Sequence, residues 1–133
     1  KMIDKYIYKN PQKSIGFFSL GQLKYLSALQ YVDAIVGNSS SGLTEAPSFK
    51  IGIINIGDRQ KKRIKAKSVI DCIPKKKNIK QSLKKIYSSN FKKLLKKNNN
   101  PYDNGLPSKK IARVLRNFKL QNKMKKNFFN LKF

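Results

Sequence analysis

The sequence predicts an α/β fold with a parallel sheet that helices cover on both faces. Apolar runs of strand length recur between Ser14 and Ile73, and stretches with apolar residues at helical spacing separate them. Each pair of neighbouring parallel strands needs a crossover, which is usually a helix. In such sheets ligands bind beyond the carboxyl ends of the strands, so the loops at that edge are the first place to look for a site.

The N-terminal segment is predicted to contain two helices and one strand. Residues 1–9 have the pattern of a helix that Asn10 and Pro11 end. Residues 14–20 form an apolar, aromatic run between turn residues and are expected to be a buried strand. A second helix, ending near Tyr31, is indicated by the helical spacing of Leu23, Leu26, Ala28 and Leu29.

The central segment is predicted to contain three strands and a short helix. Residues 33–36, 51–56 and 68–73 are apolar runs of strand length. A helix is expected from Ser40, and Pro47 should keep it short or kinked because proline has no N–H.

The last segment is basic and helical. Helices are expected over residues 78–87 and 91–95 and from about Ser108, and residues 98–105 have the composition of a loop. The inward side of the first two helices is predicted to consist of Ile79, Leu83, Ile86, Leu94 and Leu95. A chain of 133 residues suffices for one small domain, which we assign to residues 1–118, with a basic, frayed C-terminal tail over residues 119–133.

Three further features bear on location. No stretch approaches the roughly 18 apolar residues of a membrane span, and nothing at the start resembles a signal peptide. A lone Cys72 excludes an intrachain disulfide, suits the cytoplasm and is expected to pack in the core. Because the chain opens on Lys1 in a helical pattern, we expect it to be part of a longer protein.

The net charge of +25 raises the question of nucleic-acid binding. Residues 1–60 contain seven basic and four acidic side chains, whereas residues 61–133 contain twenty-four basic and two acidic ones. The excess therefore lies outside the candidate site described next. Lysine far outnumbers arginine, the residue that suits bidentate recognition of bases and phosphates, so sequence-specific nucleic-acid binding is the less favoured alternative.

The segment from Asp33 to Ser48 has the pattern of an anion site. An apolar run reaches Gly37, three serines and Gly42 follow, and a helix then begins. Unpaired N–H groups and the dipole at a helix N-terminus favour a phosphate or diphosphate. An ordinary N-cap explains the same residues equally well.

Three predicted loops lie at strand carboxyl ends and can converge on one ligand: residues 38–42, residues 57–60 and Leu20 with Gly21. Arg59 could clamp a phosphate there, or pair with Asp58 at the surface. Glu45 would repel a phosphate, but its carboxylate could accept hydrogen bonds from vicinal sugar hydroxyls. Together these groups describe a site for a nucleotide diphosphate.

The same motifs resemble the C-terminal half of hydrolysing UDP-N-acetylglucosamine 2-epimerases. The resemblance lies in FSLG at 18–21, LKYL at 23–26, residues 37–49, INIGDRQ at 54–60, AKSVIDC at 66–72, and then NPY at 100–102, Gly105, Ser108 and Ile111. It implies a Rossmann-like domain, one half of a glycosyltransferase-B fold. Where that family commonly has glycine after Gln-Lys, this chain has Lys62, which would be strained if the position needs a positive φ.

The resemblance also implies a function. Ser39 and Ser40, with Gly42 in the same turn, would bind the diphosphate, Glu45 the ribose, Arg59 the phosphate region and the backbone near Leu20 the uracil. The reaction would eliminate UDP from UDP-N-acetylglucosamine and hydrate the glycal to N-acetylmannosamine, for sialic-acid-type sugar synthesis. No cofactor and no metal are implied.

The chain itself offers no convincing catalytic base, since it has no histidine and its only acids near the predicted site are Asp33, Glu45, Asp58 and Asp71. We therefore expect the acid and base in an N-terminal domain or a split-gene partner, and no turnover by this chain alone. Three alternatives stay open: an epimerase for another UDP- or GDP-linked amino sugar, a basic nucleic-acid-binding protein, and a degenerate remnant. A homo-oligomer also stays open.

Overall fold

The computed structural model describes residues 1–103 and 105–119 and divides the chain into two units. The first unit contains Lys1–Tyr102 and the second begins at Asp103. The predicted basic tail at 119–133 lies outside the described residues except for Lys119, so the boundary at residue 118 remains a prediction.

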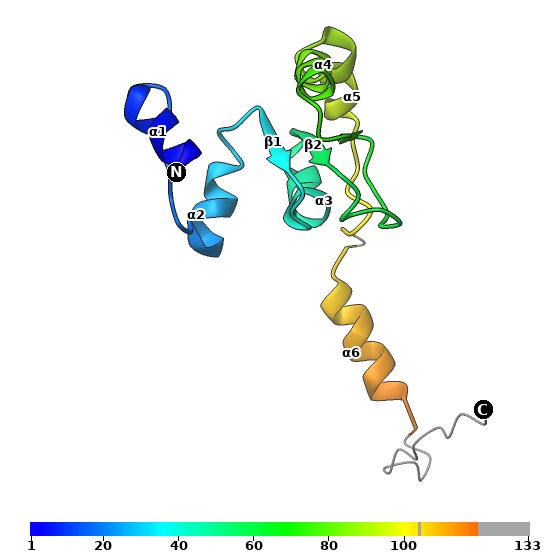
Figure 1. Cartoon of the computed structure of the whole chain (residues 1–133). Helices are drawn as coiled ribbons and strands as arrows, with labels where there is room; N and C mark the ends of the chain where they lie inside the picture. The colour runs from blue at the N-terminus through cyan, green and yellow to red at the C-terminus, as the bar shows by residue number, and fades with distance from the viewer. Residues whose placement is uncertain (104, 120–133) are drawn as a thin grey trace, which may run out of the picture. The chain divides into compact units, whose positions relative to one another are not determined.

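A three-stranded parallel sheet forms the centre of the first unit (Figure 1). Its strands are β1 (Ala34–Gly37), β2 (Gly52–Ile56) and β3 (Val69–Cys72), in the order β1-β2-β3. Asn55 on the central strand β2 stands opposite Gly37 on β1 and Asp71 on β3. The predicted α/β class and the three central strands are confirmed, and this is a Rossmann-like arrangement.

Helices connect and flank these strands. In chain order they are α1 (Met2–Lys9), α2 (Gly21–Ala28), α3 (Ser41–Thr44), the 3₁₀ helix η1 (Ala46–Phe49), α4 (Lys76–Ile86) and α5 (Ser89–Lys96), with α6 (Pro107–Asn117) in the second unit. The short helix after β1 gives way to η1 at Glu45 and Ala46, as Pro47 at the start of η1 predicts. The predicted helices are confirmed to within one or two residues at most ends.

Two apolar clusters cover the two faces of the sheet. One contains Leu29, Ala46, Ile51 and Ile53, and the other contains Ile54, Cys72, Ile86 and Phe91. The side chains of Ile53 and Ile54 point to opposite faces because successive residues of a strand alternate, and both are almost completely buried. Cys72 is a buried free cysteine in this core, as expected.

The strand predicted at residues 14–20 is wrong. The segment has no strand conformation, and Ile15, Phe17 and Phe18 are all exposed, Phe18 completely. No strand in the described part of the chain pairs with it, and without a pairing partner an apolar run cannot satisfy its backbone groups as a buried strand. Leu20 therefore precedes α2 but does not follow a strand.

One predicted inward position is wrong, and one apolar residue that indicated the second helix is exposed. Leu23 on α2 is 81% exposed, and Leu83 on α4 is 36% exposed while its neighbours Ser82 and Ile86 are buried. Ile86 follows Ser82 by four residues, so these two share one face of α4, whereas Leu83 lies about 100° further around the helix. Phe91, not part of the predicted inward side, is the buried residue of α5.

Candidate functional site

The serine-rich turn lies at the carboxyl edge of the sheet, between β1 and α3. Gly42 donates its N–H to the Ser39 carbonyl oxygen at 3.3 Å, and Leu43 donates to the Ser40 carbonyl oxygen at 2.9 Å. The N–H groups of Ser40 and Ser41 have no acceptor among the described residues. Two amides of this turn are therefore available to an anion, whereas that of the predicted residue Gly42 is occupied by the protein's own carbonyl.

Three hydroxyl groups form a chain beside this turn. The Tyr25 hydroxyl donates to Ser41 Oγ at 3.0 Å, and Ser41 Oγ lies 3.0 Å from Ser39 Oγ. The contact fixes α2 to the start of α3. Sequence reasoning selected Ser39 but missed Tyr25 and Ser41, although Tyr25 lies within the LKYL motif and Ser41 within the run of serines.

A cavity of about 680 Å³ opens next to these hydroxyls. It contains three of the predicted site residues, Leu20, Ser39 and Glu45, and its other lining residues are Phe17, Ser19, Gly21, Gln22, Tyr25 and Ser41. A space of this size holds a small organic ligand. Ser40, Gly42 and Arg59 do not line it.

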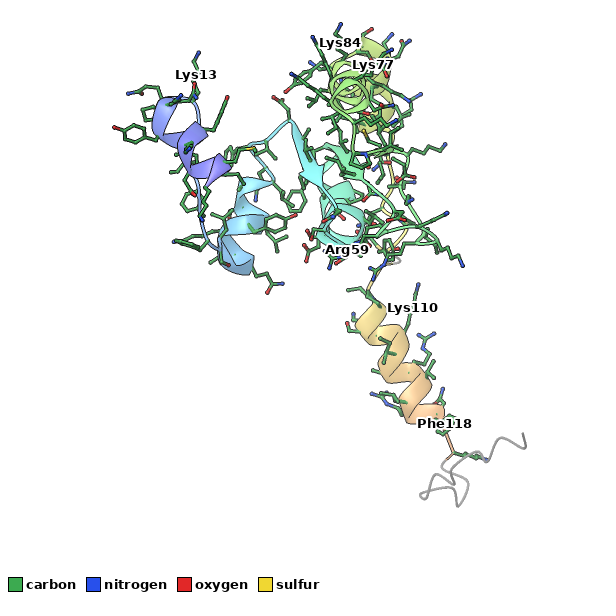
Figure 2. The ribbon with its side chains drawn as sticks, in the orientation of Figure 1. Lys13, Arg59, Lys77, Lys84, Lys110 and Phe118 are labelled. Carbon is green, nitrogen blue, oxygen red and sulfur yellow. The ribbon has the colours of Figure 1, made fainter. Side chains whose placement is uncertain are left out.

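The turn that follows β2 lies against the serine-rich turn. Gln60 is buried, and its Nε2 donates to the backbone carbonyl oxygen of Asn38 at 2.8 Å. Its neighbour Arg59 is exposed, and Figure 2 labels it in the first unit, far from Lys77 and Lys84. Among the described residues Arg59 and Asp58 form no ion pair, so the guanidinium is not held by its neighbour. These two loops therefore meet at Gln60 and Asn38, and their convergence on one ligand stays a prediction.

A polar network extends from this edge across β2 and β3. Asn55 Nδ2 donates to Asp71 Oδ1 at 2.7 Å, and Lys65 Nζ lies 2.8 Å from Asp71 Oδ2. Partial burial raises the pKa of Asp71, but the hydrogen bonds from Lys65 and Asn55 and the positive charge of Lys65 outweigh this effect. The net result is a pKa below the usual 3.8, so Asp71 is ionised at neutral pH and unsuited to act as a base.

The remaining acids do not assemble into catalytic machinery. Asp33 precedes β1 at the amino end of the sheet and accepts a hydrogen bond from the Tyr87 hydroxyl, so the expectation that it lies near the site is wrong. Within residues 1–103 and 105–119 no three His, Cys, Asp or Glu side chains are grouped to hold a metal ion. Among the described residues, Glu45 is the one acid that lines the 680 Å³ cavity.

The excess positive charge includes the lysines of α4 and the loop after β2, which reads KKRIKAK at 61–67. Figure 2 shows Lys77 and Lys84 on α4, at the opposite end of the first unit from Arg59. The carboxyl edge thus provides hydroxyls, two open amides, the guanidinium of Arg59 and the carboxylate of Glu45, a set suited to a phosphorylated ligand that also bears hydroxyls.

Comparison with known families decides the relationship. The family model described as UDP-N-acetylglucosamine 2-epimerase matches residues 1–116. The chain belongs to this family. The match includes the serine-rich turn, Glu45 and Arg59, and the resemblance inferred from the motifs is confirmed.

Individual relatives agree with the family. A GDP/UDP-N,N'-diacetylbacillosamine 2-epimerase (hydrolyzing) of Campylobacter jejuni is 42% identical over 132 residues, covering 98% of this chain and 34% of the relative. The polysialic acid biosynthesis protein P7 of Escherichia coli is 38% identical, covering 80% of this chain and 28% of the relative. A UDP-N-acetylglucosamine 2-epimerase of Neisseria meningitidis is 39% identical over 50% of this chain and 18% of its own length. The chain therefore spans about a third or less of the length of these relatives.

Within the described residues of this epimerase-family chain, no helix has the length and apolar character needed to cross a lipid bilayer.

Proposed function

We propose that this chain is the UDP-binding part of a hydrolysing nucleotide-sugar 2-epimerase. The observation that carries the proposal is the cavity at the carboxyl edge of the sheet, which brings Leu20, Ser39 and Glu45 together although 25 residues separate the first from the last. The sequence resemblance assigned Leu20 to the uracil, Ser39 to the diphosphate and Glu45 to the ribose. UDP can bind all three residues at once only if they line a common cavity, as they do.

The chemistry of each part of the site fits one part of UDP. The diphosphate would accept hydrogen bonds from the open amides of Ser40 and Ser41 and from the serine hydroxyls. Glu45 would accept from the ribose hydroxyls, and the uracil would lie near Leu20. Arg59 would contact the phosphates from the turn that Gln60 holds against Asn38.

The role of these groups in the reaction would be electrostatic. Elimination breaks the bond between the sugar C1 and the phosphate oxygen, and negative charge develops on the departing UDP. Amides and a guanidinium held at that position stabilise this charge without reorganisation. Removal of the C2 proton needs a base that this part of the protein does not offer, so we expect it from a protein segment homologous to the rest of the relatives.

Exposed apolar side chains support such a partner. Met2, Ile3 and Tyr8 on α1 and Phe17 and Phe18 after it are largely exposed and surround a cavity of about 670 Å³. A contiguous apolar surface of this kind is typical of an interface with another protein segment. We propose that the catalytic domain covers it, in the same polypeptide or as a separate subunit in the cytoplasm.

The substrate class would be a UDP-linked N-acetylated amino sugar. The relative that matches nearly the whole chain is named for GDP/UDP-N,N'-diacetylbacillosamine and favours UDP-N,N'-diacetylbacillosamine among such sugars, with the GDP-linked sugar as an alternative. The resemblance of the motifs favoured UDP-N-acetylglucosamine. Either substrate would leave the same UDP in this site.

The proposal is tested by the melting temperature of the chain with and without UDP. A ligand specific for the folded state raises the midpoint, by an amount that grows with the ratio of ligand concentration to Kd. We expect UDP to raise it and uridine, at equal concentration, to raise it less. No shift with UDP, together with salt-dependent binding of arbitrary duplex DNA, would instead favour the basic nucleic-acid binder. A coupled assay of UDP release should detect no turnover by the isolated chain.

A further inference from the structure

Asn55 is a buried amide in the centre of the sheet edge. It lies near the end of β2, in register with Gly37 on β1 and Asp71 on β3, and only 2% of its surface is exposed. Residues in register on neighbouring strands point to the same face. The side chain of Asn55 therefore shares its face with the side-chain position of Gly37.

The orientation of this amide is fixed by its neighbour. Asn55 Nδ2 donates to the ionised carboxylate of Asp71 at 2.7 Å, and Lys65 neutralises the other carboxylate oxygen at 2.8 Å. Rotation of the amide by 180° would place two acceptor oxygens against each other. Oδ1 must therefore be the atom that faces away from Asp71, and this buried oxygen has no hydrogen-bond donor among the described residues.

The free oxygen belongs to a residue that lines a recess of about 350 Å³. The polar residues and the two glycines around this recess are Tyr25, Gly37, Asn38, Ser39, Ser41, Gly42 and Asn55. Apart from the chain neighbours of Gly37, no atom of the described residues lies within 4 Å of the position that its Cβ would occupy, so the space beside Asn55 is open on the β1 side. A buried acceptor without a donor costs free energy, and a ligand that supplies a donor recovers it.

The recess and the larger cavity share three residues, Tyr25, Ser39 and Ser41. If the diphosphate binds at these shared hydroxyls and the nucleoside occupies the larger cavity, the other end of the ligand enters the recess. The group that meets Asn55 Oδ1 cannot be a phosphate oxygen, because both atoms are acceptors. A hydroxyl or an amide N–H fits.

We infer that Asn55 contacts the sugar of the bound nucleotide sugar, accepting a hydrogen bond from one of its hydroxyl or N-acetyl N–H groups. The inference rests on the proposed function and assigns Asn55 to sugar recognition. Asp71 and Lys65 act as positioning residues that keep the acceptor turned toward the ligand.

The test separates the sugar from the nucleotide. Calorimetric Kd values are measured for UDP and for UDP-N-acetylglucosamine with the wild-type chain, Asn55→Leu and the control Asn99→Leu, whose side chain is exposed and outside both cavities. We expect Asn55→Leu to weaken binding of the nucleotide sugar about 3- to 10-fold, as loss of one hydrogen bond does, and to leave UDP binding within about twofold. Equal loss for both ligands, or for neither, would overturn the inference.

A second measurement covers the case in which Asn55→Leu fails to fold. Wild-type affinities are compared for UDP-N-acetylglucosamine and for analogues that each lack one sugar hydroxyl or the acetamido N–H. One analogue should bind about 3- to 10-fold more weakly than UDP-N-acetylglucosamine. Equal affinity for all of the ligands would reject the role of Asn55. Failure of the wild-type chain to bind UDP itself would overturn the proposed function and this inference together, whereas UDP binding without any sugar contribution would overturn this inference alone.

Discussion

Gln60 and Asn38 are 22 residues apart in the sequence, and the hydrogen bond of 2.8 Å from Gln60 Nε2 to the Asn38 carbonyl oxygen joins their two turns. Gln60 follows Arg59, and Asn38 precedes Ser39. The bond therefore fixes the turn that bears the arginine against the turn that bears the serines. Its donor side chain is only 3% exposed, so water competes little for either partner.

Replacement of Gln60 by leucine should loosen this connection. Gln60→Leu leaves the Asn38 carbonyl without its donor, and we expect the free energy of unfolding to fall by about 1–2 kcal/mol in urea titrations. The Kd for UDP should rise several-fold because the two turns no longer hold a common geometry. Gln81→Leu, at an exposed position of α4, is the control, and equal stability of the two variants would contradict the structural role of Gln60.

Arg59 should act on the phosphates and not on the nucleoside. Charge-assisted hydrogen bonds contribute about 1.5–3 kcal/mol, so Arg59→Ala should weaken UDP binding by about 10-fold or more while leaving the weak binding of uridine unchanged. Arg63→Ala removes another exposed arginine from the same loop and should have little effect. Calorimetric Kd values for UDP and uridine test this prediction. A similar loss of UDP affinity in Arg59→Ala and Arg63→Ala would indicate general electrostatic attraction.

Lys62 adopts φ = 69°, in the left-handed region that favours glycine. The positive φ that would strain a lysine at this position is therefore present. Lys62→Gly removes the clash of the Cβ, but glycine also raises the conformational entropy of the unfolded chain. We expect the free energy of unfolding to rise by about 0.5 kcal/mol in total. Lys61→Gly, at a neighbour with negative φ, should lose about 0.5–1 kcal/mol. Thermal unfolding of both variants tests whether their stabilities change in opposite directions. A similar change in stability for both variants would exclude relief of strain at Lys62.

The sequence allowed prediction of the sheet because three apolar runs bounded by turn residues found partners in register. The run at residues 14–20 looked similar, but whether a strand forms depends on a neighbouring strand, which no local pattern reveals. The prediction that Leu83 faces inward was wrong for a related reason. Helical spacing identifies an apolar stripe, yet the contact with the sheet selects which part of that stripe is buried, and Ser82 and Ile86 face β2 and β3 instead.

The candidate site shows the same limit. Ser39 and Glu45 could be predicted because a turn before a helix has a definite chemistry, and the cavity contains both. The role of Asn98, which lines neither cavity of the site, could not be predicted, since a run of three asparagines indicates only a loop. In the structure Asn98 is buried, donates to the Pro47 carbonyl and Ser68 Oγ, and accepts from the Ser68 N–H. Such a role depends on two segments 30 and 51 residues away.

The ion pair of Asp71 should make the stability of the fold sensitive to acid. Its pKa in the folded state lies below 3.8, the usual value in the unfolded chain, so the native state favours the ionised carboxyl. This contribution is fully present above the unfolded pKa and is lost as the pH falls through the folded pKa, that is, below about 3.8. The free energy of unfolding of the wild-type chain should therefore fall more steeply from pH 5 downward than that of Asp71→Asn. Asp58→Asn, which removes an exposed carboxyl, should follow the wild-type curve, and coincident curves for all three proteins would show that Lys65 and Asn55 do not stabilise the Asp71 carboxylate.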